Sequence, residues 1–117
     1  MYKVIVRAKK DADAVRAALK TFYESWGVEV TTLRGVRGYE EFRDALEGVL
    51  DSEKFNVVLV GREDEDKLAL EEEMPPNVVF SLVPRKRVRN ARLFTIREAL
   101  ERGRAKIRNT VRWRGAY

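Results

Sequence analysis

Arginines in the last third of the chain are the residues whose type and spacing most favour binding chemistry. Residues 84–117 hold ten arginines and two lysines against two acidic residues, a net charge of +10, whereas residues 1–83 carry a net charge of −5. A solvated helix face normally mixes both signs. A guanidinium group binds phosphate through two parallel hydrogen bonds and stacks on bases, whereas an ammonium group acts as a point charge. The composition therefore predicts a surface for an anionic partner, and nucleic acid fits better than a membrane.

These cationic side chains fall into two stretches. An extended backbone over 84–92 would direct alternate side chains to one side. A helix from residue 95 would carry arginines at i, i+7, i+11 and i+15 along one face, a ladder of roughly 22 Å, with Arg102 and Lys106 in a flanking row. Trp113 follows the ladder, where it could stack on a base. The predicted nucleic-acid contacts are Arg85, Lys86, Arg87, Arg89, Arg92, Arg97, Arg104, Lys106, Arg108, Arg112, Trp113 and Arg114.

A secondary candidate for phosphate binding is the loop over 33–38. Its glycines would let backbone N–H groups approach an anion at a helix N-terminus. The same G-x-x-G spacing is a common turn between a strand and a helix, and both interpretations stay open. The Walker A and dinucleotide spacings are missing, which disfavours ATP and NAD. The candidate residues are Arg34, Gly35, Arg37 and Gly38.

Cysteine and histidine are both absent. Their absence excludes disulfides, thiolate nucleophiles, Ser-His-Asp machinery and zinc or haem sites built on imidazole or sulfur. The metal chemistry that survives is Mg²⁺ bound by carboxylates, for which Asp11, Asp64 and Asp66 are the candidates. We expect no cofactor, and Mg²⁺ only if the chain is an enzyme of that kind.

Apolar patterns predict βα units along nearly the whole chain. The expected strands are 2–8, 28–33, 55–61 and 78–83, and the expected helices are 11–27, 39–50, 64–74 and 95–111. The first helix begins near Asp11 or Asp13, and the last buries a stripe that includes Ile96, Leu100, Gly103, Ile107 and Val111.

We expect an α/β fold, a three-layer sandwich around a four-stranded, mostly parallel sheet in the order 2-1-3-4, with 28–33 at an edge. One domain would span 1–117, with an acidic body over 1–83 and a basic segment over 84–117. The terminal W-R-G-A-Y sequence suggests a domain excised from a longer protein. The crevice between the first and third strands would be lined by Lys9, Lys10, Asp11, Arg62, Asp64 and Asp66.

Composition also bears on the setting of the protein. No apolar run approaches the roughly 18–20 residues of a membrane span, and the N-terminus lacks signal-peptide regions, so we expect a cytoplasmic protein. Glutamine is absent and Glu, Lys and Arg are abundant. This bias is typical of proteins that work at high temperature, and it predicts a hyperthermophile source.

Residues 4–12, which read V-I-V-R-A-K-K-D-A, resemble the first strand and turn of the Toprim family, whose pattern there is V-I-V-E-G-K-x-D. The acid-x-acid pair of Asp64 and Asp66 is similar to the pair that the family carries after its third strand. The likeness covers about the first 70 residues and implies an α/β fold in a nucleic-acid context. The family glutamate, a general acid/base and metal ligand, falls on Arg7, and the family glycine falls on Ala8. An arginine there repels Mg²⁺, so the resemblance implies a domain without catalysis.

These observations predict an accessory, non-catalytic domain that contacts the phosphates of structured RNA such as rRNA or tRNA, with RNA favoured over DNA. One alternative is a Mg²⁺-dependent nuclease or primase-like enzyme, and another is a module that docks its basic helix on an acidic protein. A third is the N-terminal recognition domain of an RNA-modifying enzyme. A purely structural interpretation also stays open, in which the basic helix pairs with the acidic segment 63–73 of the same chain.

Overall fold

The computed structural model describes residues 2–22, 28–33, 37–83, 96–103 and 105. In chain order the elements are β1 (Tyr2–Val6), α1 (Lys9–Phe22), β2 (Val28–Thr32), α2 (Tyr39–Val49), β3 (Phe55–Val60), the 3₁₀ helix η2 (Arg62–Glu73) and β4 (Val78–Leu82). Residues 96–103 form a further helix. Among the residues that the structure describes, no helix is long and apolar enough to cross a membrane.

The four strands form one parallel sheet in the order β2-β1-β3-β4, as predicted. Tyr2 of β1 pairs with Val28 of β2 on one side and with Phe55 of β3 on the other. The continuous apolar run of β3 is explained by its central place, since both faces of a covered parallel sheet are dry. β2 and β4 are the edge strands.

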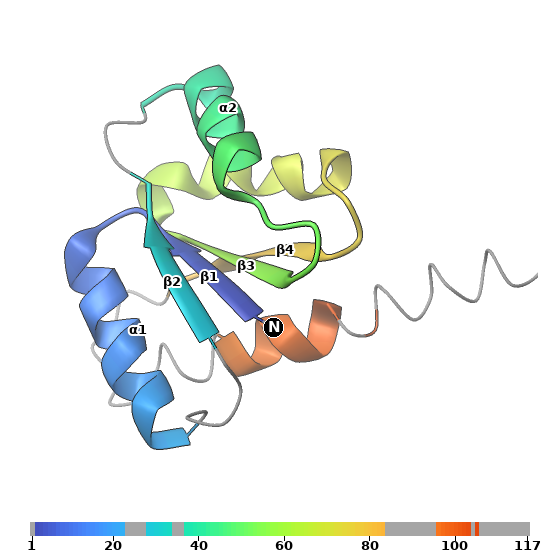
Figure 1. Cartoon of the computed structure of the whole chain (residues 1–117). Helices are drawn as coiled ribbons and strands as arrows, with labels where there is room; N and C mark the ends of the chain where they lie inside the picture. Colours follow the sequence, from blue (N-terminus) through green and yellow to red (C-terminus); the bar gives the residue numbers. More distant parts are fainter. Residues whose placement is uncertain (1, 23–27, 34–36, 84–95, 104, 106–117) are drawn as a thin grey trace, which may run out of the picture.

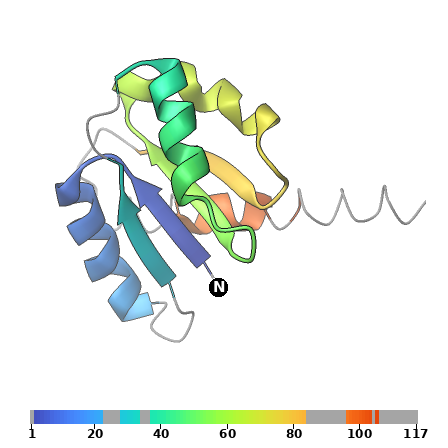
Figure 2. The ribbon, with the colours of Figure 1, turned by 45° about the horizontal axis from the view of Figure 1, so that its top comes forward.

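Helices cover both faces of the sheet. One core cluster joins α1 and the helix over 96–103 to the first face through Val6, Val15, Val57 and Leu100. The other joins α2 and η2 to the second face, where Phe42, Leu46, Leu70 and Phe80 are buried. Figure 1 shows these two layers on opposite sides of the strands, and the turned view of Figure 2 shows the same division. The three-layer sandwich expected from the sequence is therefore present.

Two helices begin earlier than predicted. α1 starts at Lys9, not near Asp11 or Asp13, because the Ala8 carbonyl oxygen accepts hydrogen bonds from the backbone N–H groups of Asp11 and Ala12. Asp11 therefore lies in the first turn of α1, where a carboxylate favours the helix dipole. η2 begins two residues before the predicted start, and it is kinked at Asp64, where φ is −113° and ψ is 16°. Its C-terminal end precedes Pro75, as the sequence predicts.

The helix over 96–103 lies directly on the sheet. Ile96, Leu100 and Gly103 are buried as predicted, whereas Ile107 and Val111 lie outside the described residues. A Cβ atom at Gly103 would lie 1.7 Å from Cζ of Phe55. Only a glycine therefore allows this helix to approach the start of β3 so closely.

Candidate functional site

The predicted site residues divide into those that the structure describes and those that it does not. Arg37, Gly38, Arg97 and the three candidate metal ligands are described. The predicted residues outside the described part of the chain are Arg34, Gly35, Arg85, Lys86, Arg87, Arg89, Arg92, Arg104, Lys106, Arg108, Arg112, Trp113 and Arg114.

Arg97 is on the solvent side of its helix, with 65% of its side chain exposed. Its Nε atom lies 3.5 Å from Oε1 of Glu101, one helical turn further on. An exposed pair of this kind stabilises a helix by only about 0.3–0.5 kcal/mol, so a phosphate can compete for the guanidinium group. Arg97 is therefore accessible to an anion, and the other three arginines of the predicted ladder lie outside the described residues.

The described half of the glycine loop favours the structural interpretation. Gly38 precedes α2 with φ −92° and ψ 167°, an extended conformation that any residue adopts. The backbone N–H of Arg37 donates to Oε2 of Glu41 at 3.3 Å. Glu40 and Glu41 both lie in the first turn of α2, so an incoming anion would meet carboxylates at this helix N-terminus.

The carboxyl edge of the sheet holds a buried ion triad, which we define as Arg7, Asp64 and Lys67. Asp64 is fully buried, and its Oδ1 atom lies 2.6 Å from Nζ of Lys67, itself only 5% exposed. The other carboxylate oxygen accepts a hydrogen bond from Nη1 of Arg7, the residue that follows β1. The Lys67 ammonium also lies 5.7 Å above the ring centre of Phe42, a cation–π contact.

Asp64 is a carboxylate in this setting. Burial alone would raise the pKa of Asp64, but the hydrogen bonds from Lys67 and Arg7, with their positive charges, outweigh it and hold the pKa below the ordinary value of 3.8. Both carboxylate oxygens are engaged by cations, so Asp64 faces inward and does not line an open crevice. Asp66, in contrast, is 74% exposed, with Oδ1 3.8 Å from Lys67 Nζ.

The candidate metal ligands are thus not arranged as a metal centre. Among the described residues, no group of three or more carboxylates is close enough to hold an ion. A metal at Asp64 would have to displace two cations that neutralise the carboxylate. The sequence carried a signal for this arrangement, since Arg7 occupies the first position after the strand.

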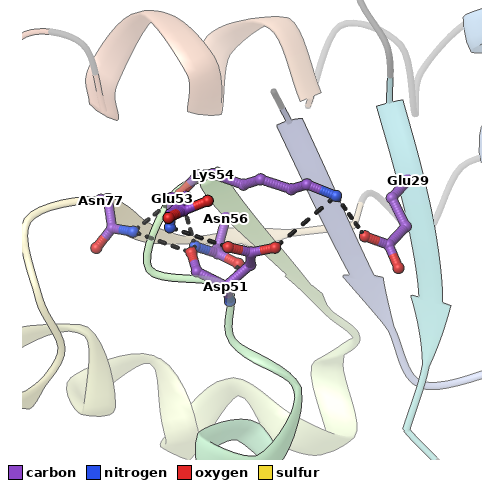
Figure 3. A network of polar contacts seen from close by, with 6 residues as sticks. All are labelled: Glu29, Asp51, Glu53, Lys54, Asn56 and Asn77. Carbon is purple, nitrogen blue, oxygen red and sulfur yellow. Dashed lines mark hydrogen bonds and ion pairs between the residues drawn. The ribbon is translucent and has the colours of Figure 1, made fainter.

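A second polar network closes the opposite, amino edge of the sheet (Figure 3). The buried Asn56 side chain donates to the backbone oxygens of Asp51 and Lys54, at 2.8 and 2.9 Å, and accepts a hydrogen bond from the Asp51 backbone N–H. Asn77 donates to the same two oxygens. The loop between α2 and β3 is therefore held to the starts of β3 and β4 by amide side chains, a role that sequence reasoning missed.

Lys54 extends this network to the edge strand β2. Its Nζ atom donates to Oε2 of Glu29 at 2.9 Å and lies 3.8 Å from Oδ2 of Asp51. The hydrogen bond from Lys54 is the main cause that lowers the pKa of Glu29, and the same bond raises the pKa of Lys54. These polar groups satisfy one another, which gives the network a structural role and explains the acidic residue on β2.

Charge is sorted by face of the sheet. α2 and η2, which cover one face, contain eleven acidic and three basic residues. α1 and the helix over 96–103, which cover the other face, contain six basic and four acidic residues. In the sequence, residue 103 is followed by Arg104, Lys106, Arg108, Arg112 and Arg114. The layer of α2 and η2 is therefore strongly acidic, whereas the layer of α1 and the helix over 96–103 has a small excess of basic residues.

One cation of the basic segment is engaged by the acidic layer. Nη2 of Arg102 lies 2.9 Å from Oε1 of Glu71 on η2. This contact is of the type expected if the basic helix neutralised the acidic segment 63–73. Among the described residues it is the one ion pair that joins 84–117 to 1–83.

Comparison with protein-family models, with curated proteins and with solved structures finds no match to this chain.

Proposed function

We propose that this chain is a non-catalytic RNA-binding domain that uses its Arg-rich segment, residues 84–117, to contact the phosphates of structured RNA. The main observation in support is the sorting of charge between the two layers. An acidic layer on one face repels a polyanion, and residues 96–103 of the basic segment pack on the other face. This polarity would orient RNA toward the Arg-rich side. A cytoplasmic location fits this role.

Ion pairs within the body bear on the same proposal. Eight of them join described residues of 1–83, and they engage seven of the 17 acidic residues in that part of the chain. They are Arg7–Asp64, Arg16–Asp13, Arg43–Glu47, Arg43–Glu73, Lys54–Glu29, Lys54–Asp51, Lys67–Asp64 and Lys67–Asp66. These seven carboxylates are therefore less available to neutralise the Arg-rich segment.

The buried ion triad supports a role without catalysis. Arg7 stands at the position where the Toprim resemblance would place a metal-binding glutamate, and it binds the Asp64 carboxylate instead. A degenerate Toprim-like domain in which an internal guanidinium and ammonium take the place of a metal ion is consistent with this geometry. Kinship with that family is part of the proposal.

Salt dependence of binding tests the proposal. If about six arginines contact the phosphates of a duplex-like RNA, log affinity falls with log salt at a slope on the order of −5. Fluorescence anisotropy with a labelled RNA hairpin at salt concentrations between about 50 and 300 mM measures this slope. We expect the triple variant Arg104→Ala, Arg108→Ala, Arg112→Ala to have a slope shallower by about 2 to 3.

A matched triple variant controls for net charge. Arg16→Ala, Arg43→Ala and Arg62→Ala remove the same number of positive charges from exposed positions of the body. We expect this variant to keep most of the original slope. Equal slopes in the two triple variants, or a ladder variant that binds like the unmodified chain, would remove the Arg-rich segment from the interface. Stronger competition by an acidic peptide than by unlabelled RNA would instead favour a protein partner.

A further inference from the structure

At the outer edge of β4, side chains from both layers bind backbone groups that point away from the sheet. Asn77 and Val83 make ladder hydrogen bonds with β3, through the Asn77 carbonyl and the Val83 N–H. Because the backbone of a strand alternates with a period of two, Phe80 directs its own N–H and C=O toward the outer edge. These two groups would otherwise be available to another strand.

Glu71 and Arg102 form hydrogen bonds with these two backbone groups of Phe80. Oε1 of Glu71 accepts the Phe80 N–H at 2.7 Å and lies 2.9 Å from Nη2 of Arg102. The same Arg102 nitrogen donates to the Phe80 carbonyl oxygen. We call this arrangement of Glu71, Phe80 and Arg102 the edge clamp. Glu71 belongs to η2 on one face and Arg102 to the helix on the other, so the clamp joins the two layers around the edge strand.

The clamp also holds the helix on which the predicted ladder begins. Arg102 lies in the last described turn before Arg104, and on the same helix as the exposed Arg97. Several arginines must contact one RNA at the same time, and each group that is ordered before binding lowers the entropic cost of that contact. A charge-assisted hydrogen bond to Glu71 is a strong way to hold this helix at the edge.

We propose that Glu71 is a positioning residue for RNA binding, which acts through Arg102 to hold the helix over 96–103, and with it Arg97, at the edge of the sheet. This inference rests on the proposed function. The predicted effect of removing Glu71 on RNA affinity is opposite to the effect expected from charge alone. Removal of a carboxylate beside a cationic segment should strengthen polyanion binding through simple electrostatics, whereas removal of Glu71 should weaken it.

The experiment compares Glu71→Ala with Glu72→Ala. Both variants remove one carboxylate from the same helix, and Glu72 makes no ion pair with any described residue. The probe is the same RNA hairpin, measured as a salt series. We expect Glu72→Ala to bind with equal or slightly higher affinity, and Glu71→Ala to bind roughly fivefold more weakly with a shallower salt slope, because fewer arginines act together.

A conservative variant and a structural measurement complete the test. In Glu71→Gln the side-chain oxygen still accepts from Phe80 and Arg102 but has lost its charge, so its affinity should fall between the other two. If Glu71→Ala does not fold, the pair Glu71→Gln and Glu72→Gln carries the same comparison. Hydrogen exchange of the Phe80 amide should be slow in the unmodified chain and in Glu72→Ala, and faster in Glu71→Ala.

The outcomes separate this inference from the function on which it rests. An unmodified chain that does not bind the hairpin overturns the RNA proposal, and the positioning role with it. A chain that binds, but whose Glu71 and Glu72 variants change affinity equally, overturns the positioning role alone. The same holds if the Phe80 amide exchanges at one rate in all variants.

Discussion

Asp64 is the residue whose environment departs most from what its type suggests. A buried carboxylate is costly unless it is paired and hydrogen-bonded. Here Lys67 binds one carboxylate oxygen of Asp64 and Arg7 binds the other, while 31% of the Arg7 side chain stays exposed. The triad lies at the carboxyl edge between β1 and β3, where open parallel sheets commonly bind ligands. An internal ion cluster thus occupies this position of the fold.

Removal of the Asp64 carboxylate should be strongly destabilising. Asp64→Ala leaves the Lys67 ammonium buried without its main partner, and we expect the free energy of unfolding to fall by about 3 kcal/mol. Asp66→Ala, at an exposed position of the same helix, should change it by less than about 0.5 kcal/mol. Urea unfolding followed by circular dichroism measures both. Equal effects of the two substitutions would show that the triad does not stabilise the fold.

The triad also has a pH signature. Because the pKa of Asp64 is lower in the folded state than its ordinary value of 3.8, its contribution to stability is complete above that value and is lost as pH falls through the folded pKa. The unmodified chain should therefore lose stability below about pH 4 more steeply than Asp64→Asn. Urea unfolding at a series of pH values between neutral and acid measures the difference in slope. Parallel curves would contradict a lowered pKa.

At the scale of elements, the contact between Gly103 and Phe55 fixes how the last described helix packs on the sheet. Phe55 also contacts the ring of Tyr2 edge-on, with ring centres 6.2 Å apart. In Gly103→Ala the new methyl group would overlap the Phe55 ring. We expect overpacking to cost about 1 to 3 kcal/mol of stability despite the higher helix propensity of alanine.

Gly48 offers a matched control on α2. A Cβ atom there would meet nothing within 4 Å. Gly48→Ala should therefore stabilise the protein by about 0.5 to 1 kcal/mol through helix propensity alone. Thermal unfolding should show lower stability for Gly103→Ala and higher stability for Gly48→Ala. Phe55→Leu in the Gly103→Ala background should restore part of the lost stability. A stabilising Gly103→Ala would show that the helix does not lie as close to β3 as described.

At the scale of the whole molecule, the described part of the basic segment contributes to the core. Ile96, Ala99 and Leu100 are buried in the same cluster as β1 and β3. A chain that ends at residue 105 keeps these contacts and loses Lys106, Arg108, Arg112 and Arg114. We expect it to unfold cooperatively, and its salt slope for RNA to be shallower by about 3.

A chain that ends at residue 95 is the informative contrast. It lacks the three buried apolar residues and should expose one face of the sheet, with loss of cooperative unfolding and binding of a hydrophobic dye. Calorimetry and dye fluorescence distinguish the two truncated chains. Cooperative unfolding of the shorter chain would show that the helix over 96–103 is not part of the core.

The sequence by itself determined the order of elements and the topology. Apolar runs of five or six residues and amphipathic stretches are local signals, and they sufficed for the parallel sheet in the order β2-β1-β3-β4 and for the buried face of residues 96–103. The start of α1 was misplaced because Asp11 is a good N-cap residue, whereas the Ala8 carbonyl closes the first turn in the structure. The division of charge between 1–83 and 84–117 was equally readable from composition.

The tertiary structure alone decided which charges meet. Asp64 pairs with Arg7 across 57 positions, and Arg102 meets Glu71 across 31 positions, separations at which no local pattern selects a partner. The same holds for Asn56 in β3 and Asn77 just before β4, whose side-chain amides donate hydrogen bonds to backbone oxygens of the same loop. Periodicity reports which side of an element is apolar, but the partner of a polar side chain depends on how the layers pack. For that reason the edge clamp and the buried ion triad emerged only from the folded chain.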